Sequence, residues 1–292
     1  MTNALTTRLQ LSIYPTQMLE MALAKVQIVL VEPAGPLNVG SVARVMKNMG
    51  LRTLVLVNPQ CDPLGLEARQ MAVHGVDILE TAQRVETLPE ALQGCQRAIA
   101  TTARVRTLPT QLEPPRTALP WLLEDSVTSA LIFGPEYRGL SNVELNYAQR
   151  FVCIPSSSEY PALNLAQAVA VCCYELYQSA QTRSQSETEN LLPLLPKTPS
   201  PSPLSPIHSV EAAPLDVLEG YYEHLEAVLL KIGYLYPHTA SARMEKFRRL
   251  LNRATPTTEE VIMLRGILRQ MEWAVQCLPK SVINDASEPN EF

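Results

Sequence analysis

Three segments that lie far apart in the chain share one pattern: an apolar, β-branched run, a short polar loop and then helical spacing of apolar residues. The segments are 36–44 (PLNVGSVAR), 130–142 (ALIFGPEYRGLSN) and 154–169 (IPSSSEYPALNLAQAV). Buried strands that alternate with helices are typical of a parallel sheet covered on both faces. In such a sheet the loops after the strands meet at the carboxyl edge, where ligands bind. We therefore expect an α/β domain with its functional site at that edge.

The first segment predicts a helix that starts at Asn38, a preferred N-cap residue, and stops at Gly50. Its polar face carries Ser41 and Arg44, so Asn38 and Arg44 should lie at the mouth of one loop-to-helix junction. A capped surface helix with a solvated arginine would show the same spacing. We expect strands at 26–31, 53–57, 76–79, 97–101, 129–133 and 151–154, and helices also at 64–73, 88–92 and 165–177.

A proline-rich stretch divides the 292-residue chain. Seven prolines fall between Pro193 and Pro214, among many serines and threonines, so this stretch should be an extended linker. The expected organisation is given by residue ranges: flexible extension 1–25, α/β domain 26–180, linker 181–214, helical domain 215–278 and flexible tail 279–292.

Helical spacing returns after the linker at 215–235, 243–253 and 259–277. The middle segment contains five basic residues and one acidic residue, Glu245, whereas the net charge of the whole chain is −5. Such a run is often a solvated face, but here it is also the strongest basic cluster and a candidate phosphate-binding surface. Its members are Arg243, Lys246, Arg248, Arg249 and Arg253.

A further polar cluster follows the strand at 97–101: Thr101 and Thr102, then Arg104 and Arg106. Two hydroxyls and two arginines at the end of a strand suit an anionic or nucleoside ligand, and a solvated loop would have the same composition. The sequence thus adds a fourth candidate loop to the same sheet edge.

The three motifs, in this order and spacing, resemble those of the SpoU branch of the SPOUT (class IV) RNA methyltransferases, over about residues 26–180. Within that branch the runs EPAGPLNVGSVARVMKNMG, TTARVRTLP, HLEAVLLKIGYL, RRLLNRA and LRGIL are similar to the TrmJ tRNA methyltransferases, up to about residue 278. The resemblance implies transfer of a methyl group from S-adenosylmethionine to the ribose 2′-hydroxyl of nucleotide 32 in the tRNA anticodon loop. It also implies a homodimer whose site is completed across the interface.

The implied fold is a SPOUT-type parallel sheet with a C-terminal trefoil knot, followed by a small α-helical domain. Periodicity alone would predict an unknotted sheet, because threaded chains are nearly absent among folds. By resemblance, catalysis would use Arg44, Asn38, Glu136 and Asn164; the cofactor would be held at Thr101, Thr102, Gly134, Ile154, Ala162, Leu163 and Asn164. The residues that would contact RNA are Arg104, Arg106, Arg243, Lys246, Arg248, Arg249 and Arg253.

Two roles are open for Arg44, as the base that takes the hydroxyl proton or as a cation that stabilises the alkoxide. The chain departs from many SpoU relatives at Ala162, where they have a serine, so that hydroxyl must be dispensable or come from Ser156, Ser157 or Ser158.

Rival functions are methylation of ribosomal RNA and a catalytically silent SPOUT-fold RNA-binding protein. Ala162 fits the silent protein, whereas Asn38, Arg44, Glu136 and Asn164 oppose it. A dehydrogenase is poorly supported, because no G-x-G-x-x-G opens the first helix.

The six cysteines form no C-x-x-C pair, and Cys172 and Cys173 should be buried thiols in a reducing cytoplasm. The four histidines lie far apart, and no apolar run approaches a membrane span, so we expect neither a metal nor a membrane.

Overall fold

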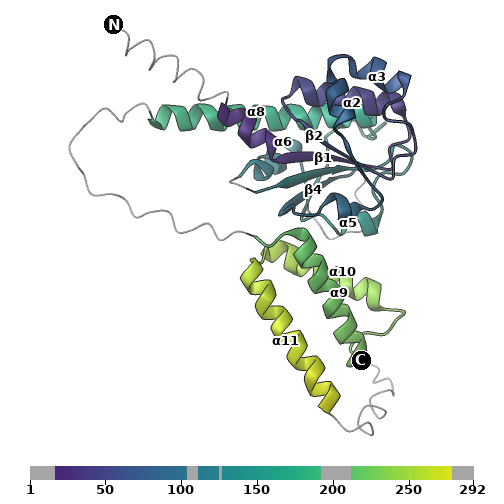
Figure 1. The fold of residues 1–292 in the computed structure, drawn as a ribbon, viewed down its shortest axis with the longest axis vertical. Coiled ribbons are helices and arrows are strands. Elements are labelled where there is room, and N and C mark those ends of the chain that lie inside the picture. The colour runs from purple at the N-terminus through teal and green to yellow at the C-terminus, as the bar shows by residue number, and fades with distance from the viewer. Residues whose placement is uncertain (1–16, 104–110, 125–126, 192–211, 278–292) are drawn as a thin grey trace, which may run out of the picture. The chain divides into compact units, whose positions relative to one another are not determined.

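The computed structural model describes residues 17–103, 111–124, 127–191 and 212–277. The chain divides into two compact units between His208 and Ser209, and each is described by itself. The first unit contains the sheet and the second contains helices (Figure 1).

Within the described residues, seven parallel strands form one sheet in the order β3-β2-β1-β6-β4-β7-β5. The strands are β1 (Val26–Val31), β2 (Thr53–Val57), β3 (Gln83–Val85), β4 (Arg97–Thr101), β5 (Leu112–Glu113), β6 (Ser129–Phe133) and β7 (Arg150–Val152). The central strands β1 and β6 are almost wholly buried, as expected for strands with helices on both faces. The parallel α/β architecture is confirmed.

Helices cover both faces of this sheet (Figure 1). They are α2 (Pro36–Asn48), α3 (Leu66–Ala72), α4 (Val76–Glu80), α5 (Leu88–Ala91), α6 (Pro115–Ala118), α7 (Asn142–Leu145) and α8 (Leu165–Leu191), with 3₁₀ turns at Val73–Gly75 and Leu119–Leu123. Apolar faces of α2, α3 and α8 join one core with the sheet residues Ile28, Leu30 and Phe133. On the other face, Gln27 donates to the carbonyl of Ala91 on α5.

Close packing of α2 against α3 fixes the start of α2 beside the sheet edge. A methyl group on Gly40 would lie 2.1 Å from the carbonyl oxygen of Ala68, so only glycine permits this approach. The N-terminal turn of α2 is therefore held by backbone-to-backbone contact as well as by its apolar face.

One predicted strand is wrong: residues 76–79 form α4, and the strand beside β2 is β3, which follows it. Ile78 and Leu79 turn inward while Asp77 stays at the surface and pairs with Lys47 at 2.5 Å. Short apolar runs are compatible with either a strand or one helical turn, and packing against the neighbouring helices decides here. The short strands β3 and β5 were not predicted.

Three predicted boundaries also differ. The helix α2 starts at Pro36 with Gly35 as its N-cap, so Asn38 lies inside the first turn and its side chain is available to other loops. Residues 17–24 of the expected flexible extension are helical, and Leu23, 1% exposed, packs in the core. The helix α8 continues to Leu191, past the expected start of the linker at 181, whose residues 192–211 lie outside the described part.

The second unit has α9 (Leu215–Lys231), α10 (Ala240–Ala254) and α11 (Thr258–Cys277), as the helical spacing predicted. Its core is built by Tyr221, Tyr222 and Leu225 of α9 with residues of the other two helices. The backbone turns after α10 at Thr255, which has a left-handed φ of 46°.

Candidate active site

A cavity of about 160 Å³ opens beside the carboxyl ends of β4, β6 and β7. Apolar side chains of Phe133, Leu140 and Val152 form part of its lining. Residues from all of the predicted cofactor loops also line it: Thr101, Thr102, Gly134, Ile154, Ala162 and Leu163. Asn164 is not in the lining.

The wall of this cavity depends on Gly134. The backbone after β6 turns back so closely that a methyl group there would lie 2.3 Å from the amide nitrogen of Leu140. Gly139, with φ of 67°, completes the turn. Side chains at position 134 would therefore displace the loop that carries Glu136.

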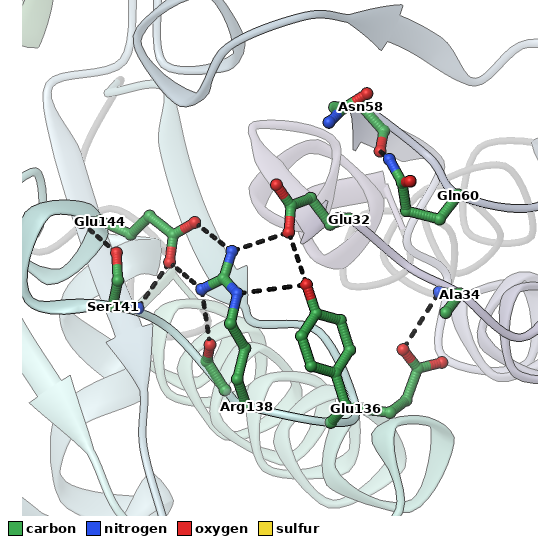
Figure 2. A network of polar contacts seen from close by, with 10 residues as sticks. Glu32, Ala34, Asn58, Gln60, Glu136, Arg138, Ser141 and Glu144 are labelled. Carbon is green, nitrogen blue, oxygen red and sulfur yellow. Dashed lines mark hydrogen bonds and ion pairs between the residues drawn. The ribbon is translucent and has the colours of Figure 1, made fainter.

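At the rim of the cavity, one hydrogen-bonded chain joins the three loops. Asn164 Nδ2 donates to Asn38 Oδ1 at 2.9 Å, and Asn38 Nδ2 donates to Glu136 Oε1 at 2.8 Å. The Glu136 carboxylate also accepts from the amide of Ala34 at 3.2 Å (Figure 2) and from the amide of Gly35 at 3.3 Å. Residues from α2, the loop after β6 and the start of α8 thus hold one another in place.

The backbone dictates the orientation of both amides. Asn164 Oδ1 accepts from the amide of Ala166 at 2.9 Å, which caps α8 and leaves Nδ2 to donate. Asn38 must then accept through Oδ1 and donate through Nδ2 to Glu136. This order suits an ionised carboxylate at Glu136, whose two oxygens accept three hydrogen bonds from Asn38 and the amides of Ala34 and Gly35.

The pKa of Glu136 also favours the ionised carboxylate. Partial loss of water around the carboxylate raises its pKa, but the hydrogen bonds from Asn38 and from the amides of Ala34 and Gly35 outweigh this and lower it below the usual value. Glu136 is therefore ionised at neutral pH.

A second network braces the same loop through Arg138 (Figure 2). Its guanidinium donates to Glu32 at 2.8 Å and to both oxygens of Glu144 at 2.7 and 2.9 Å. Tyr137 donates its hydroxyl to the same oxygen of Glu32 at 3.0 Å. The hydrogen bond to Glu144 raises the pKa of Arg138 above its usual range, so the guanidinium stays charged at any ordinary pH.

Glu144 connects this network to α7. It accepts from the amide of Ser141, while its own amide donates to the Ser141 hydroxyl, which makes a capping box. Arg138 therefore joins the end of β1, the loop after β6 and the first turn of α7.

Two family profiles match the chain: the SpoU rRNA methylase family over residues 25–174, and the C-terminal domain of the tRNA methyltransferase TrmJ over residues 216–281. The chain belongs to the SpoU rRNA methylase family, in its TrmJ group. The resemblance seen in the three motifs is thereby confirmed. The trefoil knot expected of this fold stays a prediction.

Similar proteins cover nearly the whole chain. The tRNA (cytidine/uridine/adenosine-2′-O-)-methyltransferase TrmJ of Pseudomonas aeruginosa is 40% identical over 253 residues, 86% of this chain and 95% of that protein. The tRNA (cytidine/uridine-2′-O-)-methyltransferase TrmJ of Klebsiella pneumoniae is 40% identical over 255 residues, with 86% and 97% covered.

Solved structures agree with the fold. The crystal structure of TrmJ from Z. mobilis ZM4 has a TM-score of 0.69 at 30% identity, covering 84% of this chain and 98% of that one. A probable methylase family protein from Haemophilus influenzae Rd KW20 has a TM-score of 0.54 at 28% identity, covering 87% and 98%.

Arg44, the remaining catalytic candidate of this SpoU chain, is exposed on α2. Among the described residues its side chain has no hydrogen bond or ion pair, and Glu136 binds Asn38 and the loop amides instead of Arg44. Ser41 and Leu37 lie on the same helical face, one and two turns earlier respectively. The guanidinium of Arg44 is therefore open to solvent on this face of α2.

The serine loop before Ala162 is internally bonded. The Ser156 hydroxyl donates to the carbonyl of Pro161 at 2.9 Å, and Ser157 Oγ accepts from the amide of Glu159 at 3.3 Å. Ser156 therefore supports the backbone next to Ala162, although it does not reproduce a hydroxyl at that position.

The basic cluster on α10 is less available than its sequence suggests. Arg248 makes a two-pronged ion pair with Glu219 on α9 and lies 4.5 Å from the centre of the Tyr222 ring. Arg249 pairs with Glu245 at 3.1 Å. Arg243, Lys246 and Arg253 are exposed, whereas Arg104 and Arg106 lie outside the described residues.

Cys172 and Cys173 are buried on α8, as predicted. Burial raises the pKa of the Cys172 thiol to about 12, so it stays protonated and unreactive. Across the described ranges no three His, Cys, Asp or Glu side chains gather as metal ligands would. No described helix is both long and apolar enough for a membrane span.

Sequence reasoning missed Glu32, Tyr137, Arg138 and Glu144. The S-x-x-E spacing of Ser141 and Glu144 was a visible sign of a capping box. No spacing rule could have paired Arg138 with Glu32, because they come from different strands' loops.

Proposed function

We propose that the chain transfers a methyl group from S-adenosylmethionine to the ribose 2′-hydroxyl of nucleotide 32 in the anticodon loop of tRNA, in the cytoplasm. The observation that carries this proposal is the chain of hydrogen bonds from Asn164 through Asn38 to Glu136 at the rim of a loop-lined cavity. The TrmJ-type C-terminal domain favours tRNA over ribosomal RNA, and relatives at 40% identity are tRNA 2′-O-methyltransferases by name.

The cavity suits the cofactor in its chemistry. Phe133, Leu140 and Val152 offer apolar surface for a base, and the backbone around Gly134 and Leu163 offers amides and carbonyls. When bound, S-adenosylmethionine supplies an activated methyl group on a positively charged sulfonium. Thr101, Thr102, Ile154, Ala162 and Leu163 are the residues we assign to hold it.

The side chains at the rim position the acceptor ribose. Asn38 and Asn164 are locked in one orientation by Glu136 and the cap of α8, so their remaining polar edges are fixed in direction. Arg44 acts on the hydroxyl, as base or as stabilising cation.

We further propose a homodimer that brings Arg44 to the site of its partner. Leu37, 52% exposed, shares its helical face with Ser41 and Arg44, and α8 exposes Tyr174 at 48% and Val171 at 37%. The helices α2 and α8 pack against each other, so these apolar groups belong to neighbouring elements. Burial of this surface by a second copy would remove exposed apolar area and give Arg44 a partner.

The test is methylation of defined RNA by the purified full-length protein. With S-adenosylmethionine and unmodified tRNA, nucleoside mass spectrometry should detect a 2′-O-methylated nucleoside, and reverse transcription at low nucleotide concentration should map it to position 32. Ribosomal RNA serves as the matched substrate and should stay unmethylated. Methylation of ribosomal RNA alone would favour the rival enzyme, and cofactor binding without any turnover would favour the silent RNA-binding protein.

A further inference from the structure

The connection between α9 and α10 holds two tyrosine rings toward solvent. Tyr234 is 52% exposed and Tyr236 is 40% exposed, whereas Leu235 between them is 1% exposed and packs in the core. The amides of Tyr234 and Leu235 both donate to the carbonyl of Leu229 at 3.0 Å. Because the backbone and the leucine are anchored, the rings on either side are held outward by the fold.

Each exposed ring has a flat basic group beside it. The guanidinium of Arg243 lies 5.6 Å from the centre of the Tyr234 ring and is fixed by donating to the Tyr234 carbonyl at 2.9 Å. The rings of Tyr236 and His238 are nearly parallel, with 24° between their planes and 5.9 Å between their centres. These are the arrangements by which proteins present surfaces for stacking.

The segment 231–246 that carries these rings has a positive net charge, although the whole chain is acidic. Exposed Lys231 and Lys246 lie at the two ends of the segment. Glu245 is the sole acidic residue between them in sequence, and it is paired with Arg249. Exposed aromatic rings beside cationic side chains suit a polyanionic ligand that also has planar groups.

We propose that Tyr234 and Tyr236 bind unpaired bases of the tRNA by stacking, while Arg243 and Lys246 meet the adjoining phosphates. This inference rests on the proposed function and specifies which part of the RNA the helical unit contacts. Paired stems hide their base faces within the stack, whereas single-stranded bases offer them. The source of the bases is either the anticodon loop or the unpaired 3′ end of the acceptor stem.

A Tyr234→Leu, Tyr236→Leu double variant removes the flat faces and keeps apolar bulk. Binding of the full-length protein to oligouridine and to a blunt RNA duplex of equal length would be measured by fluorescence anisotropy at several salt concentrations. We expect oligouridine affinity to fall about tenfold for each stacked base lost, with duplex affinity and the salt slope unchanged, because stacking releases no counterions. Tyr236→Phe, which keeps its ring, should bind as wild type does.

Two further RNAs identify the source of the bases. If an isolated anticodon stem-loop loses affinity for the double variant, the loop is bound; if an acceptor minihelix does, its 3′ end is bound. Equal losses for duplex and single strand, or wild-type affinity for both, would overturn the proposal. Wild-type protein that binds oligouridine through its tyrosines but methylates no tRNA would refute the proposed function and leave the stacking surface standing. Thermal unfolding of each variant confirms that the helical unit is intact.

Discussion

Asn164 Nδ2 donates to Asn38 Oδ1 at 2.9 Å and so connects residues that are 126 positions apart in the sequence. Asn38 in turn donates through Nδ2 to Glu136, so the side-chain amide of Asn38 accepts one hydrogen bond and donates another. Every member of this chain also contacts the backbone or another member. Substitutions that keep the size of these side chains therefore test whether they position the acceptor ribose, more directly than substitutions that shorten them.

The first prediction concerns Asn38→Asp, which keeps the size of the side chain. The new carboxylate would still accept from Asn164 but would lie about as far from Glu136 as the amide does now, so two like charges would repel each other. We expect single-turnover methylation to slow by about a hundredfold, the scale of a lost positioning contact. Asn48→Asp, at the exposed end of the same helix, is the control and should methylate normally. Equal rates for both variants would contradict the assignment.

Arg44→Ala is the second prediction. Because Arg44 is exposed and has no partner among the described residues, its removal should leave thermal stability and cofactor binding unchanged. Methylation should fall at least about a hundredfold, as expected for loss of a base or of a group that stabilises an oxyanion. Arg52→Ala removes another exposed arginine, eight residues later in the sequence and just before β2, and should have no effect on turnover. The methylation rates of both variants, measured with saturating tRNA and cofactor, test this prediction.

The third prediction uses pH. Glu136 has a folded-state pKa below its usual 4.5, so its stabilising contribution is complete above pH 4.5 and is lost as pH falls through the folded-state value. Glu136→Gln cannot accept from all of its donors and does not titrate. The difference in Tm between wild type and this variant should be constant from neutral pH to about 4.5 and should shrink below it. A constant difference down to pH 2 would mean that the carboxylate is not held in its ionised form.

The elements of the sheet were predictable because buried parallel strands are continuous β-branched runs, such as VQIVLV in β1. The same rule failed at residues 76–79, where four residues suit a strand and a helical turn equally. At the site, the strand pattern predicted that the three loops meet at one sheet edge, and the family resemblance singled out Asn38, Glu136 and Asn164 within them. Their mutual bonds could not, since no local pattern specifies which side chains meet across loops.

The contacts of Arg138 show more clearly what the sequence could not predict. It is adjacent in sequence to predicted motif residues, yet its partner Glu32 is 106 positions away and directly follows another strand, β1. Charge counting likewise treated Arg248 as free for RNA, although Glu219 neutralises it. Sequence gives the number of charges, whereas pairing depends on the fold.

The fourth prediction concerns Arg138→Met. Loss of the guanidinium leaves the half-buried carboxylates of Glu32 and Glu144 close together and frees the loop that carries Glu136. Cofactor affinity, measured by calorimetry, should weaken by roughly tenfold, equivalent to about 1.4 kcal/mol. Arg69→Met breaks an exposed pair with Glu80 and serves as the control, with an expected stability loss of only about 0–1 kcal/mol. Unchanged cofactor affinity in Arg138→Met would show that the loop is rigid without this network.

The last prediction separates the packing and binding roles of basic residues on α10. Arg248 stacks on Tyr222 and pairs with Glu219, so it joins α10 to α9. Arg248→Met should destabilise the helical unit by about 1–3 kcal/mol, because a largely buried carboxylate loses its partner. Lys246→Gln removes an exposed charge and should leave Tm unchanged while reducing the salt slope of tRNA binding by about 0.7–0.9. Thermal unfolding and binding at several salt concentrations, measured on both variants, test this division; a stable Arg248→Met protein with a reduced salt slope would return Arg248 to the RNA-binding set.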